Sequence, residues 1–224
     1  HCRESRGSAS RTKMKTLIVT GGRPPSPELL HKTLADEVAY IIAAASGANV
    51  LLDHGIDFDL AVGDFDSLNE SSLAKIKQNT EVITYEVKKD FTDTEAAYHE
   101  AVRHGATEVL ILGATGTRMD HFMGNLALLQ IALNQGVTVR LIDEHNELFL
   151  VQSSCEIAKR DGYNISVFSF GGEVADFSLS QVAYPLKHHH LSTASTLTVS
   201  NEFLDGPARL DFIKGTVLVI LSRD

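Results

Sequence analysis

The stretch "EVLILGATGTRMDHFMGNLALLQIALNQGVTVRLI", residues 108–142, decides the fold because it contains a complete strand–helix–strand unit. Its two ends, 108–113 and 137–142, are nearly unbroken apolar runs, which are typical of strands buried on both faces of a parallel sheet. Between them, leucines recur at helical spacing, and Gly136 supplies the end of that helix. The stretch therefore predicts one βαβ unit of an open, mainly parallel sheet.

Similar units precede this stretch in the chain. Further strand-length apolar runs lie at 16–20, 38–43, 59–63 and 81–87. A second clear helix is predicted over 92–105, where Thr92 and Glu95 have capping-box spacing and Gly105 supplies a stop. We therefore expect an N-terminal α/β domain over residues 14–146.

After about residue 146 the pattern changes to short alternating segments with no convincing helix. These segments lie at 147–152, 163–170, 173–180, 195–203, 208–213 and 215–221. Glycines punctuate them, as in all-β domains with many tight turns. Residues 147–224 are therefore expected to form an antiparallel β-sandwich domain.

The first thirteen residues, "HCRESRGSASRTK", lack apolar periodicity and precede "MKTLIVTGG", which looks like a natural start at Met14. We expect residues 1–13 to be a cloning remnant. Without them Cys155 is the one cysteine, so no intrachain disulfide can form and the cytoplasm is the expected compartment.

Charge and hydropathy exclude several classes of partner. The net charge is -9 and there is no run rich in lysine or arginine, so neither a nucleic acid nor a membrane surface is an expected partner. No apolar run approaches the roughly 18 residues that span a bilayer. A polyphosphate ligand would have to bring its own cation.

Acidic residues follow three of the predicted strands. They are Asp64, Asp66, Asp90, Asp93 and Asp120. The carboxyl ends of parallel strands share one edge of a sheet, so these side chains are expected to converge there. Several carboxylates in one crevice repel each other unless a cation lies among them, and their oxygens suit Mg²⁺. The pattern predicts a site for metal-assisted phosphoryl or pyrophosphoryl transfer.

Two glycine-containing loops could border this site. In "GATGTRMD", Gly113 and Gly116 allow backbone N–H groups to approach phosphates at a helix start, and Arg118 can supply a forked cation. The loop "GGRPPSP" could also border a nucleotide, or it could be a stiff connector. The acids have a structural alternative too, since Asp93 could simply favour a helix dipole and Asp64 or Asp66 could cap a helix.

Three consecutive histidines, His188 to His190, suggest a metal site. In a strand, however, His188 and His190 would share one face and His189 would point away, so the three cannot easily bind one ion. A solvated or interface strand is the favoured interpretation.

Five segments, in chain order, resemble the thiamine pyrophosphokinase family: "VGDFDS", "KKDFTDTEAA", "GATGTRMDHFMGN", "YPL" and "SNEF". The resemblance spans nearly the whole chain after Met14. It implies transfer of a pyrophosphoryl group from ATP to the hydroxyethyl oxygen of thiamine, giving thiamine diphosphate and AMP. It also implies that residues 14–146 are the nucleotide-binding and catalytic domain and that residues 147–224 are the thiamine-binding domain. Mg²⁺ and a homodimer with thiamine near the subunit interface are implied as well.

The resemblance assigns roles to individual residues. The implied Mg²⁺ ligands are Asp64, Asp66, Asp93 and Asp120. The implied catalytic residues are Asp66, Asp93, Arg118 and Asp120. The implied nucleotide contacts are Lys89, Thr92, Gly113, Arg118 and Asn125, and the implied thiamine contacts are Ser200 and Asn201. The chain departs from the family's pattern at Ala45, where an acid is usual, and at Thr117, where a second glycine is common.

Three functions from different classes remain open at this point. The favoured function is thiamine pyrophosphokinase. A metal-dependent phosphohydrolase could use the same carboxylates with water as the acceptor, and a non-catalytic nucleotide or thiamine sensor would bind ligand without turnover. Retention of several acids makes the sensor the weakest of the three, because a sensor has little need of a cation cluster.

Overall fold

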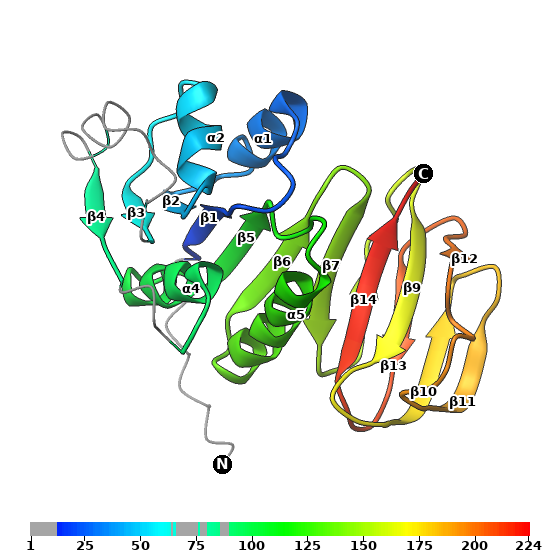
Figure 1. The fold of residues 1–224 in the computed structure, drawn as a ribbon. Coiled ribbons are helices and arrows are strands. Elements are labelled where there is room, and N and C mark those ends of the chain that lie inside the picture. Colours follow the sequence, from blue (N-terminus) through cyan, green and yellow to red (C-terminus); the bar gives the residue numbers. More distant parts are fainter. Residues whose placement is uncertain (1–12, 64, 66–75, 77–79, 86–89) are drawn as a thin grey trace, which may run out of the picture.

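The computed structural model describes residues 13–63, 65, 76, 80–85 and 90–224 (Figure 1). The predictions for Asp64, Asp66 and Lys89 lie outside the described residues. Within the described residues the chain forms a ten-stranded sheet and a four-stranded sheet.

The elements lie in the following places. The helices are α1 (Pro27–Leu34), α2 (Gly47–Asp53), α4 (Asp93–Arg103) and α5 (Met119–Asn134). In spatial order, the large sheet contains β12 (Asn201–Glu202), β9 (Asn164–Ser169), β14 (Val217–Ser222), β7 (Asn146–Val151), β6 (Thr138–Ile142), β5 (Glu108–Leu112), β1 (Lys15–Val19), β2 (Tyr40–Ala44), β3 (Leu60–Val62) and β4 (Glu81–Ile83). The small sheet contains β11 (Leu186–Leu191), β10 (Val174–Ser180), β13 (Ala208–Asp211) and β8 (Cys155–Ile157).

The part of the large sheet from β4 to β6 is parallel, which confirms the predicted α/β fold. From β1 the chain adds β2, β3 and β4 on one side and then continues at β5 on the other side of β1. The direction of winding therefore reverses between β1 and β5. Open α/β sheets bind ligands at the carboxyl ends of the strands beside such a switch point.

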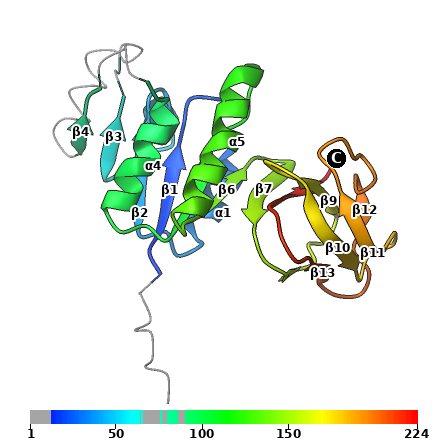
Figure 2. The same ribbon diagram turned by 90° about the horizontal axis from the view of Figure 1, so that it is seen from below.

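Alternation along the strands explains why helices cover both faces of the sheet. On β1, Leu17 and Val19 join a buried cluster that also contains Leu30 of α1 and Leu51 of α2. Ile18, between them, joins the opposite cluster with side chains of α4 and α5. The two helix layers are visible on either side of the sheet in Figures 1 and 2. Burial on both faces is the reason for the unbroken apolar runs.

The helix ends follow local sequence signals. Thr92 caps α4, and its hydroxyl accepts a hydrogen bond from the backbone N–H of Glu95 at 3.1 Å. After the ends of α4 and α5, Gly105 and Gly136 have φ of 93° and 73°, which a glycine adopts without a steric penalty. None of the helices in the described part of the chain is long and apolar enough to cross a membrane.

The C-terminal half is the predicted β-sandwich. Phe177, Leu179 and Leu210 of the small sheet share one buried core with Val167 and Val219 of the large sheet. The two sheets therefore pack face to face around this core.

The large sheet continues from one half of the chain into the other. β7 pairs antiparallel with β6, with Leu141 opposite Leu148. The proposed domain boundary at residue 146 thus falls where two paired strands are joined, and it stays a prediction. The core under α4 and α5 extends across this junction, because it includes Leu148 and Leu150 of β7 and Leu218 of β14, and the sandwich has a second core of its own.

The strand predicted over residues 195–203 is largely wrong. Residues 197–200 form turns, and only Asn201 and Glu202 pair with β9. Hydrogen bonds between side chains and the backbone replace the ladder, because the Thr198 hydroxyl donates to the Val167 carbonyl and the Ser200 N–H donates to the Ser166 hydroxyl. Serine and threonine compete with regular structure in this way, and alternation alone does not reveal it.

The three histidines lie in β11. His188 contacts Asp176 at 2.7 Å and His190 contacts Glu173 at 3.0 Å, and both imidazoles are exposed. No group of three or more metal-binding side chains gathers within the described ranges. The strand interpretation therefore fits the structure.

Candidate active site

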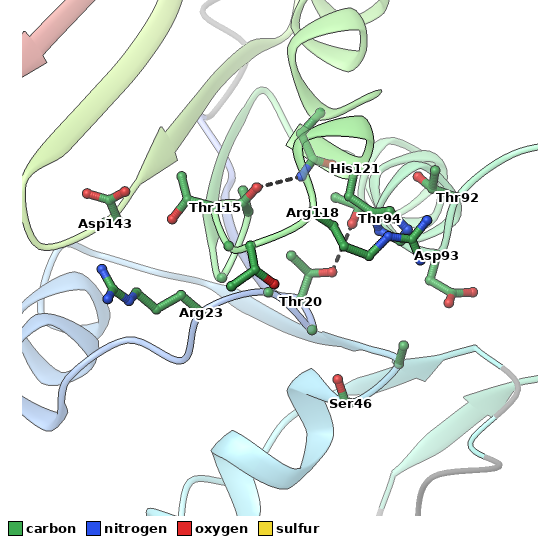
Figure 3. Close-up of a pocket in the computed structure, with 18 of the residues that line it drawn as sticks. Thr20, Arg23, Ser46, Thr92, Asp93, Thr94, Thr115, Arg118, His121 and Asp143 are labelled. Atoms are coloured by element: carbon green, nitrogen blue, oxygen red, sulfur yellow. Dashed lines mark hydrogen bonds between the residues drawn. The ribbon is translucent and has the colours of Figure 1, made fainter. Parts of the chain in front are cut away.

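A cavity of about 900 Å³ opens at the carboxyl ends of β1 and β5, at the switch point of the sheet (Figure 3). Its size lies in the range of small-molecule sites. Its walls come from the loops after β1, β2, β5 and β6 and from the first turns of α4 and α5. The lining residues are Thr20, Gly21, Gly22, Arg23, Ala45, Ser46, Phe91, Thr92, Asp93, Thr94, Gly113, Ala114, Thr115, Gly116, Thr117, Arg118, His121, Asn125 and Asp143.

The two glycine-containing loops pack directly on each other and form the floor of the cavity. The Gly22 N–H donates to the Gly113 carbonyl at 2.9 Å, and the Arg23 N–H donates to the Thr115 carbonyl at 2.6 Å. A β-carbon on Gly22 would lie 2.2 Å from the Gly113 oxygen. Gly113 has φ of 75°, and a β-carbon there would lie 2.2 Å from the Thr20 oxygen. Glycine is required at both positions because the backbones approach so closely.

The first turn of α4 contributes to one wall. Thr92 and Asp93 line the cavity, and the buried Thr94 hydroxyl lies 2.8 Å from that of Thr20, which joins this helix to the end of β1. The positive end of the α4 dipole and its first N–H groups therefore lie at the cavity. Thr92 accepts one of these N–H groups as the helix cap, so its hydroxyl has a structural role in addition to the predicted ligand contact.

Asn125 of α5 is almost fully buried at the back of the cavity. Its amide nitrogen donates to the Ala114 carbonyl at 2.8 Å. The orientation of the amide is set by chemistry, because a carbonyl can only accept a hydrogen bond. Asn125 therefore fixes the loop after β5, and the predicted nucleotide contact can use its amide oxygen.

Arg118 and Asp120 form an exposed ion pair at the start of α5. The contacts are 3.1 Å from Nε to Oδ1 and 2.5 Å from Nη2 to Oδ2. The hydrogen bond from Arg118 and, to a smaller extent, the backbone N–H of His121 lower the pKa of Asp120 to about 2. Asp120 is thus a carboxylate at neutral pH. Arg118 lines the cavity, whereas Asp120 lies at its rim and is absent from the lining.

Of the four predicted metal ligands, the structure describes two. Asp93 lies in the cavity wall and Asp120 at the rim, while Asp64 and Asp66 fall outside the description. All four offer only carboxylate oxygens, which suit a hard cation such as Mg²⁺.

Ala45, the position where the chain departs from the family pattern, lies in the cavity wall. It has φ of 49°, and its N–H donates to the Val62 carbonyl at 2.8 Å. Thr117, the second departure, also lines the cavity and is absent from the residues with positive φ. The threonine therefore meets no backbone strain in this loop.

Sequence reasoning missed Arg23 and Asp143 in the lining. Arg23 belongs to the "GGRPPSP" loop, which the sequence left open between a nucleotide border and a connector. Asp143 follows the apolar run of β6 just as the other acids follow their strands, so the same signal was present. Its Oδ1 accepts the N–H groups of His145 and Asn146 at 2.8 and 2.7 Å, which gives it a structural role in the β6–β7 turn.

Ser200 and Asn201 lie far from this cavity. Four strands separate β12 from β5, and at about 4.8 Å per strand the two differ in position by roughly 24 Å. Asn201 is buried, and its amide bonds to both backbone groups of Tyr184, at 3.0 and 2.8 Å. Ser200 beside it is exposed. The structure does not bring either residue into the cavity of its own chain.

Comparison with known families identifies the two halves of the chain separately. Residues 31–141 match the family model described as thiamin pyrophosphokinase, catalytic domain. Residues 154–217 match the model described as thiamin pyrophosphokinase, vitamin B1 binding domain. Together the two matches cover most of the chain.

Individual relatives agree over nearly the full length. The thiamine pyrophosphokinase of Bacillus subtilis is 33% identical over 216 residues, which is 94% of this chain and 100% of that protein. Its crystal structure covers 94% of this chain and 99% of its own with a TM-score of 0.85. A thiamin pyrophosphokinase family protein of Enterococcus faecalis is 31% identical with a TM-score of 0.82, over 94% of this chain and 99% of that one. The chain belongs to the thiamine pyrophosphokinase family.

Proposed function

We propose that the cavity between β1 and β5 is where this thiamine diphosphokinase transfers the pyrophosphoryl group of ATP to the thiamine hydroxyl, releasing AMP. The reaction is that of the family. The observation that carries the assignment of the site is the meeting of two glycine-rich loops, the first turns of two helices and Arg118 at the switch point. Such a place offers N–H donors and positive charge to phosphates.

The nucleotide is held by groups that favour anions. The start of α4 and the start of α5 both face the cavity, and the N-cap residue of α5, Arg118, accepts none of the helix's first N–H groups, although Asp120 accepts that of His121. We assign phosphate contacts to Arg118, to the backbone at Gly113 and to Lys89. Thr92 and the amide oxygen of Asn125 are assigned to the nucleotide as well.

Mg²⁺ is assigned to Asp64, Asp66, Asp93 and Asp120. When bound, the ion would supply positive charge that offsets the negative charge developing on the phosphates during transfer. The chain's own residues supply the geometry, since Asp93 is fixed in the first turn of α4 and Asp120 in that of α5. Because Arg118 already holds Asp120, a cation at Asp120 and a phosphate at Arg118 both compete with the existing ion pair.

The thiamine hydroxyl is oriented by a carboxylate at Asp93, Asp120 or Asp66. Transfers of this type depend mainly on positioning and on electrostatic stabilisation, so a strong base is not required. Arg118, when released from Asp120, stabilises negative charge on the transferred group.

The active enzyme is proposed to be a homodimer in which the partner supplies the thiamine contacts. Ser200 and Asn201 lie roughly 24 Å from β5 by strand spacing, too far to reach a thiamine molecule bound beside that strand, and neither lines the cavity. Exposed apolar side chains surround them, namely Tyr184 at 69%, Leu197 at 59%, Val199 at 48% and Leu204 at 48% exposure. Met119 and Met123, 65% and 60% exposed on α5, offer an apolar surface beside the cavity. Clustered exposed apolar residues are typical of interaction surfaces.

We place this enzyme in the cytoplasm. Cys155 is a free thiol, and ATP is available in that compartment. Neither a nucleic acid nor a membrane is a proposed partner, because the acidic chain lacks a basic surface run.

The reaction is tested by measuring AMP with ATP and Mg²⁺, with and without thiamine, and again after chelation of the metal. We expect AMP only when both thiamine and metal are present. Release of inorganic phosphate from ATP without thiamine would instead indicate a phosphohydrolase. Binding of ligand without any turnover would indicate a sensor.

Sharing of the site between subunits is tested by mixing two inactive variants. Asp93→Asn disables the cavity, and Ser200→Trp blocks the thiamine contact. If each site combines one cavity with the partner's Ser200, a heterodimer regains one intact site, and a random mixture recovers about a quarter of the wild-type activity. No recovery in a mixture shown to exchange subunits would contradict the shared site.

A further inference from the structure

Arg23 is a second guanidinium in the cavity, and it forms no ion pair with any carboxylate in the described ranges. It lies in the loop between β1 and α1 and is exposed. In Figure 3 its side chain extends toward the side where Asp143 lies, away from Arg118 and Asp93. The cavity therefore has one cation at each end.

The two guanidinium groups differ in what they already bind. Arg118 makes a two-point contact with Asp120, which occupies its Nε and one Nη donor. Arg23 retains its charge and its donors for a ligand. A planar guanidinium that faces a cavity without a carboxylate partner is suited to bind a phosphate at two points.

The backbone of Arg23 is held in a fixed position. Its N–H donates to the Thr115 carbonyl at 2.6 Å, and an added β-carbon on Gly116 would lie 3.3 Å from its nitrogen. The far end of the loop is anchored by the Ser26 N–H, which donates to Glu144 at 2.6 Å. The loop therefore presents Arg23 from a defined place, as a binding residue requires.

The position of Arg23 relative to the acids determines which phosphate it can reach. Asp93 and Asp120 lie on the side of α4 and α5, so the reacting β-phosphorus belongs there under the proposed function. Arg23 lines the cavity on the other side, toward Asp143, so under that function we place the remainder of the nucleotide across the switch point toward β1 and β6. The α-phosphate is the anionic group on that side of the reacting centre.

We propose that Arg23 binds the α-phosphate of the nucleotide and stabilises AMP as the leaving group; this inference depends on the proposed function. In the transfer the thiamine oxygen forms a bond to the β-phosphorus, and its proton passes to solvent. The bond from the β-phosphorus to the oxygen that bridges the α- and β-phosphorus atoms breaks. That oxygen keeps the electron pair and leaves with AMP, so negative charge grows on the α-phosphate beside Arg23. A cation fixed there is more useful in the transition state than in the ground state.

The test compares Arg23→Gln and Arg23→Lys with Lys159→Gln, which removes one positive charge from an exposed position between β8 and β9. Calorimetric titrations measure binding of AMP and of adenosine, and steady-state assays separate kcat from KM for ATP. Arg23→Gln is expected to weaken AMP binding about tenfold or more and to leave adenosine unchanged, with a comparable loss in kcat. Arg23→Lys should recover only part, and Lys159→Gln should match the wild type.

Several results would overturn the inference. These are unchanged AMP binding in Arg23→Gln, equal losses for AMP and adenosine, an altered KM with unchanged kcat, or a wild-type protein that does not bind AMP. Failure of the proposed function has a different signature, because the wild type would then form no thiamine-dependent AMP whatever Arg23 does in the binding assays.

Discussion

The cavity and the β12 region both contain residues that match the family's motifs, but the two regions use these residues differently. At the cavity, the motif residue Asn125 donates its amide nitrogen to the Ala114 carbonyl and lines the cavity, with its amide oxygen left for a ligand, and Arg23, from outside the motifs, lines the cavity too. At β12, the amide of Asn201 is engaged with its own chain through Tyr184 and the N–H of Glu202. The groups at the cavity therefore keep hydrogen-bonding capacity for a ligand, whereas the amide of Asn201 is used within the fold.

This difference indicates that a motif residue can serve the fold as well as a ligand. Asn201 satisfies the backbone of Tyr184 and so fixes the segment that contains "YPL" against β12. Buried polar groups need such partners, because an unpaired one carries a large desolvation cost. Ser200, which is exposed beside it, is the better candidate for a direct contact with thiamine.

The largest effect is expected at the floor of the cavity. Gly113→Ala places a β-carbon 2.2 Å from the Thr20 oxygen at φ of 75°, so backbone strain and steric overlap act together. We expect a loss of about 3 kcal/mol in the free energy of unfolding by urea. The matched control is Gly136→Ala, which has φ of 73° but nothing within 4 Å, and it should lose only about 1 kcal/mol. Equal losses in both variants would show that the two loops are not tightly packed.

The next effect is on catalysis alone. Asp93→Asn removes one carboxylate from the cavity wall and should reduce turnover by at least about a hundredfold, the scale for loss of one preorganised electrostatic group. Its free energy of unfolding should stay within about 0.5 kcal/mol of the wild type. Asp161→Asn, in an exposed turn of the sandwich, is the control for loss of an acidic charge. Near-normal turnover in Asp93→Asn would remove Asp93 from the metal site.

At β12 we expect substitution of the buried motif residue to reduce stability, the reverse of the result at Asp93. Asn201→Ala leaves the backbone N–H and carbonyl of Tyr184 without their partner, and it should cost about 2 kcal/mol in urea unfolding. Ser200→Ala should change stability by less than about 0.5 kcal/mol and raise the KM for thiamine. If Asn201→Ala kept full stability but lost thiamine affinity, the contrast between the two regions would fail.

The sequence predicted the parts of the fold that depend on local patterns. The unit at 108–142, the cap at Thr92 and the change to alternating segments near residue 146 are short-range signals, and the structure contains all three. The antiparallel pairing of β6 with β7 could not be predicted, because it joins the two halves through backbone contacts that leave no mark in the hydrophobic pattern. The strand prediction for residues 195–203 was wrong for a different reason. Their hydrophobic pattern alternates as in a strand, but their hydroxyl groups form hydrogen bonds with the backbone.

The site was predictable to a similar extent. Acids after strands and glycines before a helix identified Asp93, Gly113 and Arg118, because the topology of a parallel sheet brings such positions to one edge. The sequence did not predict Arg23 as a cavity residue, because the glycines and prolines of its loop indicate a turn but not the direction in which the turn runs. The hydrogen bonds between Asn201 and Tyr184 could be found only from the structure, because a contact between residues far apart in the sequence has no local sequence signal.

The smallest expected effect on the free energy of unfolding is at Tyr98. Its side chain stabilises the α/β half through a hydrogen bond, as that of Asn201 stabilises the sandwich. Tyr98 is fully buried in α4, and its hydroxyl donates to Gln135 beyond the end of α5 at 2.6 Å. Tyr98→Phe should cost about 1 kcal/mol in urea unfolding at pH 7.

The pH dependence of this cost identifies its cause. Burial raises the pKa of Tyr98 to about 12, above the value of about 10 in an unfolded chain. Stability that depends on the neutral phenol is therefore fully present below about pH 10 and is lost as the pH rises through about 12. The difference between wild type and Tyr98→Phe should shrink over that interval, whereas Tyr184→Phe, at an exposed site, should follow the wild type throughout. A difference that stays constant up to pH 12 would mean that the phenol gains water in the folded state, and the contact between α4 and the end of α5 would then be looser than the core beside it.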